Sequence, residues 1–298
     1  MNSTKKAASN IMLEYHADDF GLFPIQSQRI MDCYHNGKLN GVSVMPNSDY
    51  LPECMELLHP AQNEIAVTVH LNVIEGRSLC VPDEVSLLTD RTGTFRASFA
   101  SLLLHSYLPG RKAYQEQLKK EIRAQIYSVK AFLDQDAPLR IDGHAHYHML
   151  PVVFDALMDV IREENLNVSY IRIPREYPSL YLRHWKELRD FSPINLAKVL
   201  ILNILAVRNE KKYREFMNSL EQTVFLGVFL SGRMYRENVE PILPDALRLA
   251  KKLNRGIEIL AHPGGVYEKE DIAKLTNADD LTFLTCDFRR KEVSLFKY

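Results

Sequence analysis

Short runs of Val, Ile, Leu and aromatic residues recur along the chain, and longer stretches with helical spacing separate them. Such runs predict β-strands, and their alternation with helical stretches indicates repeated β-α units. The predicted strands are Ile11 to His16, Gly41 to Met45, Ile65 to Asn72, Arg140 to His146, Val168 to Ile173, Val224 to Leu230 and Ile257 to Ala261.

The stretches between these strands place apolar residues three and four positions apart, which predicts amphipathic helices. We expect helices at Tyr114 to Leu133, Val152 to Glu164 and Leu243 to Leu253. Pro, Gly, Ser and Thr are frequent from about Arg77 to Gly110 and predict a long excursion between a strand and a helix. Long loops that follow barrel strands are commonly functional.

Seven strand signals, each followed by a helical stretch, cover the chain. This order favours the α/β class and a TIM-barrel-like (β/α) barrel that is seven-stranded or otherwise incomplete, with a doubly wound sheet as the alternative. A single barrel of about 200 to 250 residues or more is common, so 298 residues do not require two domains. We therefore expect one domain over residues 1–298, of which 1–10 form a short N-terminal extension.

Charge and cysteine content narrow the function classes. Lys and Arg total 37 against 38 Asp and Glu, so the chain lacks the basic excess that drives nucleic-acid binding. The four cysteines are scattered without a C-x-x-C pair, which suits reduced thiols in the cytoplasm. The start of the chain has no apolar segment typical of a signal peptide. We predict a cytoplasmic protein without a nucleic-acid partner.

The most apolar run is Ile194 to Val207, which Lys198 and Asn203 interrupt. It falls short of the roughly 20 residues that span a bilayer, so we predict no membrane partner. A buried or interface-forming helix explains the run better. Packing of this helix against a second subunit would make the protein a homodimer.

Polar residues follow the predicted strands at their carboxyl ends. In a parallel barrel these ends lie on one face, where the active sites of such folds are found. Separate segments are therefore expected to converge on one pocket. The residues concerned are Asp18 and Asp19 after the first strand, His70 in the third, Asp142 and His144 in the fourth, Arg172 and Arg175 around the fifth, and His262 after the seventh.

The pair Asp18-Asp19 suggests a division of roles, because adjacent residues at a strand end point in different directions. One carboxylate could hold a metal ion while the other faces the water that the ion activates. A turn or a helix N-cap explains an isolated pair equally well. His70 could likewise be a ligand or a packing residue within an apolar strand.

The stretch "DGHAHYHML" alternates His144, His146 and His148. In an extended chain the three imidazoles would lie on one side together with Asp142, where they would be hard to bury without a shared ligand. The pattern indicates a metal site, and a polar solvent-facing edge is the alternative.

Two other groups have both functional and structural interpretations. His262 precedes a Pro-Gly-Gly turn that would expose it, although histidines before turns also occur without a function. Arg172 and Arg175 suit recognition of an oxygen-rich substrate or support of neighbouring groups, but surface charge or salt bridging explains them as well.

With these residues assembled, the sequence resembles the YdjC-like carbohydrate deacetylases, a family that includes the chitooligosaccharide deacetylases. The resemblance runs from about residue 11 to the end of the chain, in the family's order. One small departure is Val73-Ile74, where the family more usually has Leu-Thr. The matching stretches are "HADDFG", "VHLNVIEG", "DGHAHYHMLP", "IRIPRE", "FLGVFLSG", "LAHPGG" and "RRKEVSLF".

The resemblance implies a TIM-barrel-like fold and hydrolysis of N-acetyl groups on acetylated mono- or oligosaccharides, with one divalent metal ion, Mg or Zn. It implies Asp19, His70 and one histidine of "DGHAHYH", chosen as His144, as metal ligands. Asp18 would be the general base and His262 the general acid. The remaining predicted site residues are substrate-binding: Arg172, Arg175, Glu75 and His146.

Two competing functions fit a barrel of this kind. One is a different metal-dependent hydrolase, such as a phosphoesterase or an amidohydrolase of non-sugar amides. A phosphoesterase more often holds two metals and more carboxylate ligands than this sequence offers. The other is a non-catalytic sugar-binding protein, which the presence of Asp18 and His262 disfavours.

Overall fold

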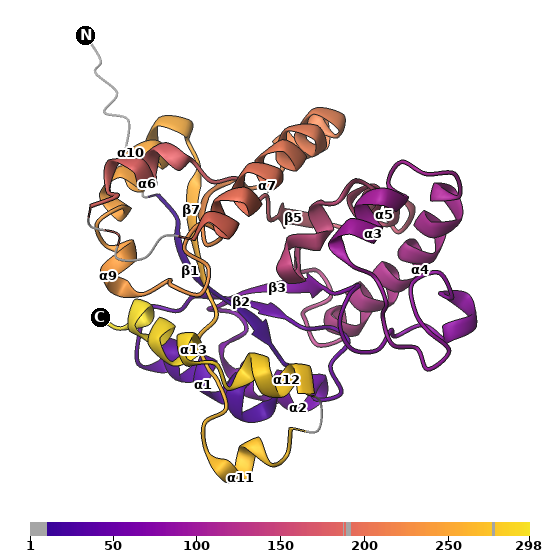
Figure 1. Ribbon diagram of the computed structural model, residues 1–298, viewed down its shortest axis with the longest axis horizontal. Helices are drawn as coiled ribbons and strands as arrows, with labels where there is room; N and C mark the ends of the chain where they lie inside the picture. Colours follow the sequence, from indigo (N-terminus) through magenta and orange to yellow (C-terminus); the bar gives the residue numbers. More distant parts are fainter. Residues whose placement is uncertain (1–10, 187, 189–191, 276–277) are drawn as a thin grey trace.

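The computed structural model describes residues 11–186, 188, 192–275 and 278–298. The predicted N-terminal extension lies outside these residues. Seven strands form one parallel sheet that curls into a half-barrel, with helices around its outer face (Figure 1). The strands are β1 (Leu13–Phe20), β2 (Gly41–Val44), β3 (Ala66–Leu71), β4 (Leu139–Gly143), β5 (Val168–Ile171), β6 (Thr223–Leu226) and β7 (Gly256–Ala261).

The strand order in the sheet is β5-β4-β3-β2-β1-β7-β6, and each neighbouring pair is parallel. The strands β5 and β6 are the two edges, joined only by an isolated bridge between Tyr170 and Glu221 in the described chain. The barrel is therefore incomplete, as predicted. All seven predicted strands are present. The largest boundary differences are that β1 continues to Phe20 and that β6 ends at Leu226.

The three predicted helices are confirmed within a few residues, and the apolar run near Ile194 is also helical. Proline occupies the first turn of several helices, where its missing N–H costs nothing and its fixed φ favours helix initiation. The helices are α1 (Pro24–His35), α2 (Leu51–Leu58), α3 (Phe99–His105), α4 (Arg111–Lys130), α5 (Pro151–Glu163), α6 (Pro178–Arg183), α7 (Pro193–Lys212), α8 (Arg214–Ser219), α9 (Arg236–Val239), α10 (Leu243–Leu253), α11 (Lys269–Ile272), α12 (Ala278–Leu284) and α13 (Asp287–Glu292). Short 3-10 segments cover His59–Ala61, Pro82–Glu84, His144–Met149 and Val293–Phe296.

The two faces of the sheet differ in chemistry because successive side chains of a strand point to opposite sides. The outer face carries apolar residues that pack against the helices, such as Val42, Val69, Ile141 and Ile259. The inner face is polar and buried. Its members include Glu14, His16, Asp18, Ser43, Thr68, His70, Arg140, Asp142, Arg172 and Glu258.

The helix α7 projects from the body of the molecule (Figure 1). Its exposed apolar side chains include Ile194, Leu200, Ile204 and Val207, and Ile204 retains 70% of its accessible surface. No helix in the described ranges has the length and hydropathy needed to cross a membrane. All four cysteines are free thiols, as their spacing predicted.

Gly41 allows β2 to approach the polar inner face of β1. A Cβ atom at this position would lie 2.5 Å from His16 Nδ1 and 2.6 Å from Glu14 Oε1. We expect Gly41→Ala to destabilise the fold by about 1 to 3 kcal/mol, because a close-packed site must shift to admit the methyl group. Urea unfolding measures the loss. Gly256→Ala is the control, since its nearest neighbours lie 3.3 Å away and include the flexible end of Met12. Equal stability of the two variants would contradict this packing argument.

Candidate metal centre and active-site cleft

The adjacent aspartates Asp18 and Asp19 lie at the end of β1 and face different surroundings. The pairing of β1 with β2 shifts between Ala17 and Phe20. Asp19 has a φ of 68°, in the left-handed region that Asp tolerates better than most residues. Phe23, rather than either aspartate, occupies the N-cap of α1. The pair therefore has a geometry that the helix-cap interpretation does not explain.

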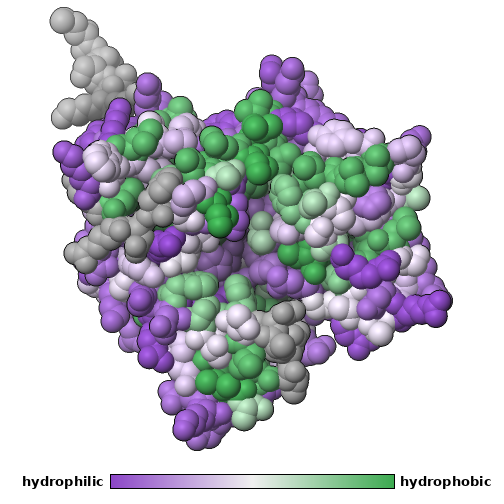
Figure 2. All heavy atoms as spheres, in the orientation of Figure 1, coloured by the Kyte–Doolittle hydropathy of each residue, from purple (hydrophilic) through white to green (hydrophobic). Residues whose placement is uncertain are grey.

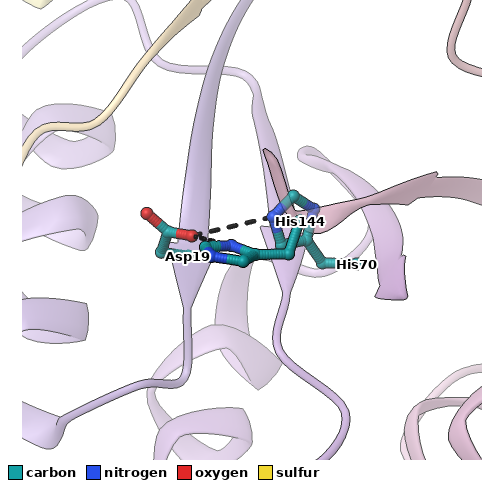
Figure 3. Close-up of side chains that lie close together, drawn as sticks. All are labelled: Asp19, His70 and His144. Carbon is teal, nitrogen blue, oxygen red and sulfur yellow. Dashed lines mark hydrogen bonds and ion pairs between the residues drawn. The ribbon is translucent and has the colours of Figure 1, made fainter. Parts of the chain in front are cut away.

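Asp19, His70 and His144 converge on one point (Figure 3). Asp19 Oδ1 lies 3.1 Å from His144 Nδ1 and 3.6 Å from His70 Nε2, and all three residues are buried. One oxygen and two nitrogen atoms, all within 4.8 Å of one another, form a group that could hold a metal ion.

The surroundings of His70 test whether these residues fit a cation. Its Nδ1 lies 2.6 Å from Asp142 Oδ1, so this nitrogen carries the proton. Its Nε2 is buried and has no hydrogen-bond partner among the described residues. A buried ring nitrogen without a partner is costly unless something else binds it. The three residues therefore fit a divalent cation, which His70 Nε2 would contact.

Ionisation states in this centre are set by neighbouring charges. Burial raises the pKa of Asp19, but the imidazoles of His144 and His70 and the guanidinium of Arg289 hold that pKa well below its usual range. Burial lowers the pKa of His70, yet the carboxylates Asp142 and Asp18 outweigh it and raise the value to about 10. For His144, hydrogen bonds to Asp19 and Glu75 overcome burial and raise the pKa to about 9.

Arg289 was not predicted as a site residue. It is fully buried on α13, and its Nη2 lies 2.7 Å from Asp19 Oδ2. This contact leaves Oδ1 of Asp19 facing the two histidines. The only sequence signal was the position of Arg289 within "RRKEVSLF", the last stretch of the family resemblance.

Asp18 lines the cleft that opens above the metal centre, and Arg172 holds it from below. Both Asp18 oxygens are 3.0 Å from Arg172 Nη1. Arg172 is fully buried and also pairs with Asp142 and Glu258. The prediction that Arg172 binds substrate directly is therefore corrected: its inward position on the fifth strand makes it a support of Asp18.

Arg175 also lies away from the cleft. It pairs with Glu210 of α7 and lines a separate cavity of about 370 Å³ beside β5. The chain leaves β5 before this residue, and the side chain of Arg175 is not among those that line the cleft. Its predicted contact with substrate has no support in this arrangement.

The cleft has a volume of about 440 Å³ and gathers residues from several strand ends. Figure 2 shows it as a hollow near the middle of this face, with apolar side chains around it. Asp18, His144 and His262 line it, as expected from their positions at strand ends, and so do Glu75 and His146. The lining residues that were not predicted include four aromatic side chains and one lysine: Phe99, Tyr147, Lys198, Phe283 and Phe288.

The three alternating histidines do not share one face, so that prediction was wrong. The chain turns into a 3-10 segment directly after Gly143, and Ala145 and His146 have φ values of 48° and 60°. Alternation places side chains on one side only in an extended backbone. His144 therefore contacts Asp19, whereas His148 Nε2 lies 2.8 Å from the carbonyl oxygen of Arg172.

His146 lines the cleft, and its ring packs edge-to-face against Phe225. Burial and the positive charge of Arg172 hold the pKa of His146 well below its usual range. Burial also lowers the pKa of His148 to about 4. Both side chains are thus neutral at pH 7, unlike the imidazoles beside Asp19.

His262 follows β7 and reaches the cleft with 21% of its side chain exposed. Glu292 holds it in place: the backbone N–H of His262 donates to Glu292 Oε2 over 2.7 Å, and His262 Nδ1 lies 3.8 Å from the same oxygen. Glu292 also accepts the backbone N–H of Met234. The "HPGG" turn is therefore tied to the C-terminal helix by a buried carboxylate.

Glu176, which sequence reasoning did not single out, positions the loop after β6. Its carboxylate accepts the backbone N–H groups of Gly227, Val228 and Phe229. Burial raises the pKa of Glu176 to about 7 in spite of these three donors. Because Gly227 and Val228 line the cleft, Glu176 determines where this wall lies.

The fold and the site together define the class of protein. It is an open α/β barrel with a candidate metal site, formed by one aspartate and two histidines, at the carboxyl ends of its strands. The chain belongs to the YdjC-like protein family, whose sequence profile matches residues 13–297. The predicted family resemblance is confirmed.

Individual relatives carry related names. A carbohydrate deacetylase from Thermoanaerobacter pseudethanolicus is 29% identical over 161 residues, which cover 54% of this chain and 61% of that protein. A carbohydrate deacetylase from Xenopus laevis is 29% identical over 59% of this chain and 54% of its own length. A chitooligosaccharide deacetylase from Yersinia pestis is 29% identical over 70% of this chain and 79% of that protein. The alignments thus span little more than half the length of the first two relatives.

A solved structure has the same fold. It is a crystal structure from Enterococcus faecalis, of a protein named for a proposed role in cellobiose-phosphate cleavage. The two chains superpose with a TM-score of 0.59 at 18% identity, over 97% of each. This similarity confirms the predicted barrel architecture.

The raised pKa values of His70 and His144 predict how metal binding depends on pH. Below pH values of about 9 and 10, the metal-free imidazoles hold the protons that a cation must displace. Apparent affinity for Zn²⁺ should therefore rise between pH 6 and 9, by about tenfold per unit for each proton released. Calorimetry in buffers of different ionisation enthalpy measures the protons released. An affinity that is constant over this range would contradict the assignment of His70 and His144 as ligands.

Proposed function

We propose that the protein hydrolyses N-acetyl groups on acetylated carbohydrates, such as chitooligosaccharides or other sugars containing N-acetylglucosamine, with one divalent cation, Zn or Mg. The observation that carries the proposal is the arrangement of Asp19, His70 and His144 beside a cleft that also contains Asp18 and His262. The names of the relatives support the choice of substrate.

An amide is a poor electrophile with a poor leaving group, so its hydrolysis needs a strong nucleophile and a proton for the departing amine. A divalent cation held by Asp19, His70 and His144 supplies Lewis acidity, which lowers the pKa of water and polarises a carbonyl group. The chain itself must supply the acid-base groups. Such groups typically contribute about 100- to 10,000-fold each.

Asp18 is the proposed general base. Its carboxylate faces the cleft, while its bond to Arg172 fixes its direction. His70 Nε2 lies 3.8 Å from Asp18 Oδ2, so the base is next to the metal centre without being part of it.

His262 is the proposed general acid. It enters the cleft from the end of β7 and can donate a proton to the leaving amine as an imidazolium. The carboxylate of Glu292 lies 3.8 Å from His262 Nδ1, which leaves Nε2 for the substrate. Acid and base thus come from two neighbouring strands, β7 and β1.

Glu75 and His146 are the proposed substrate-binding residues. Glu75 is 57% exposed at the rim and lies 3.2 Å from His144 Nε2, so it can meet sugar hydroxyls and orient a metal ligand. His146 offers a neutral imidazole to the cleft. The aromatic lining of the cleft, with a few polar groups among it, is typical of sites for small organic ligands.

The residues on the inner face of the barrel help to distinguish a one-metal hydrolase from the competing two-metal phosphoesterase. Two further groups have metal-ligand atoms close together: Glu14, His16 and Glu258, and His16, Asp18 and Asp142. Their carboxylates already pair with Arg140 or Arg172. Guanidinium groups thus take the place of a second cation there, which favours a one-metal hydrolase.

The predicted homodimer and cytoplasmic location remain proposals. The exposed apolar side chains of α7, among them Ile194 and Ile204, offer a surface that could pack against a second copy of the chain. Light scattering at micromolar concentration measures the mass. A monomer at all concentrations would rule out the homodimer.

The two adjacent aspartates should differ in their effects. We expect Asp18→Asn to keep the metal and to lower kcat at least 100-fold, because it removes the base without a ligand. Asp19→Ala should lose the metal together with activity. Elemental analysis after desalting, alongside the rate, separates the two. Equal metal content in both variants would contradict this division of roles.

Release of acetate tests the function itself. Purified protein is incubated with N-acetylated chitooligosaccharides, and acetate is measured by a coupled assay. A chelator should abolish acetate release, and added Zn²⁺ or Mg²⁺ should restore it. The matched control is p-nitrophenyl phosphate, whose hydrolysis would favour a phosphoesterase. Absence of acetate from every acetylated sugar, with metal bound, would overturn the proposed deacetylase.

A further inference from the structure

We propose that Ser43 and His16 are positioning residues for the metal ligand His70, acting through Asp142. The inference rests on the proposed metal site and concerns two residues to which the family resemblance assigns no role and which do not line the cleft. Both residues are fully buried on the inner face of the half-barrel, below the cleft.

Five side chains form a continuous hydrogen-bonded chain through the inside of the barrel. From the metal centre downward, His70 Nδ1 lies 2.6 Å from Asp142 Oδ1, and Ser43 Oγ lies 2.5 Å from Asp142 Oδ2. Ser43 Oγ in turn lies 2.7 Å from His16 Nε2, and His16 Nδ1 lies 2.6 Å from Glu14 Oε1. The chain crosses four strands, since β1, β2, β3 and β4 all contribute.

The direction of these hydrogen bonds is determined by the groups at the two ends. Glu14 and Asp142 are carboxylates, whose ionised oxygens only accept. The single proton of Ser43 therefore goes to Asp142, and Ser43 accepts from His16 Nε2–H. The other ring nitrogen of His16, Nδ1, contacts Glu14. Two further carboxylates lie near the ring, with Glu258 3.7 Å from Nδ1 and Asp18 3.8 Å from Nε2.

This direction has a consequence at the metal centre. Both oxygens of Asp142 are held: His70 Nδ1–H donates to Oδ1, and Ser43 donates to Oδ2, which also pairs with Arg172. Asp142 thereby fixes the ring of His70 through Nδ1, and Nε2 is the ring nitrogen that faces Asp19 and His144. Partners that fix the tautomer of a ligating histidine typically contribute about 10- to 100-fold to metal affinity.

The packing around the chain is consistent with a dedicated function. Gly41 leaves room for His16 and Glu14, because any Cβ there would collide with both. The far end is closed by Arg140, whose Nη2 lies 2.7 Å from Glu14 Oε2. Every donor and acceptor of the chain is thus paired except His70 Nε2, the atom that faces the proposed cation.

The test compares two substitutions on the same inner face of the sheet. Ser43→Ala removes the hydroxyl between His16 and Asp142. Thr68→Val removes a buried hydroxyl that has no partner among the described residues, two positions before His70. Zn²⁺ affinity is measured by chelator competition with the full chain at pH 7.5. We expect Ser43→Ala to weaken Zn²⁺ binding by about 10- to 100-fold, and Thr68→Val to change it less than twofold.

A spectroscopic readout separates positioning from a general loss of stability. In the Co²⁺-loaded protein, the visible absorption band should shift in Ser43→Ala but not in Thr68→Val, because only the first removes a hydrogen bond from Asp142, the partner of His70. If Ser43→Ala fails to fold, His16→Gln interrupts the same chain and is tested in the same way. Parent-like Zn²⁺ affinity and an unchanged Co²⁺ spectrum in the folded variant would overturn the proposal.

The readout is independent of the proposed deacetylase activity. Tight Zn²⁺ binding that Ser43→Ala weakens, without acetate release by the parent protein, would refute the function and leave the positioning role supported. Acetate release with equal Zn²⁺ affinity in parent and Ser43→Ala would refute the positioning role alone. Absence of Zn²⁺ and Co²⁺ binding in the parent would overturn the positioning role together with the metal site.

Discussion

The pairing of the Arg172 guanidinium with three carboxylates is the interaction on which the rest of the site depends. It is fully buried inside the half-barrel and pairs with Asp18, Asp142 and Glu258. Three buried carboxylates this close together would repel one another without a cation between them. Arg172 fixes the direction of the Asp18 carboxylate at the floor of the cleft. It also holds Asp142, the partner of His70. Removing one member of a buried ionic group typically costs about 3 to 5 kcal/mol. The same cluster therefore contributes to the stability of the fold and holds two carboxylates of the site in place.

The site above this cluster is assembled from opposite ends of the sequence. Asp19 comes from β1, His70 from β3 and His144 from the turn after β4, while Arg289 reaches Asp19 from the C-terminal helix α13. Glu292 of the same helix holds the backbone of His262. The last residues of the chain thus complete a centre that begins within the first strand. Parallel strands make this possible, because their carboxyl ends all meet at one edge.

Much of the fold could be predicted from the sequence. Apolar runs of strand length and helices with a three- and four-residue period identified all seven strands and the main helices. The placement of Asp18, Asp19, His70, His144 and His262 near one cleft followed from the rule about strand ends. The failures have physical causes. The histidine run was treated as extended, but two residues with positive φ turn it after Gly143. Arg172 was predicted to bind substrate, because the sequence does not show that its donors are matched to carboxylates on other strands.

By itself, the sequence determined the class of fold, the absence of a basic surface charge excess and the candidate ligands, since each depends on local pattern or composition. Only the tertiary structure decided which histidine meets Asp19, which arginine supports Asp18 and which buried side chains connect His70 to Glu14. These are contacts between residues as many as 270 positions apart, as between Asp19 and Arg289. These contacts depend on the register of the strands and on the direction of each side chain. A one-residue shift in register would place the same groups on the opposite face of the sheet.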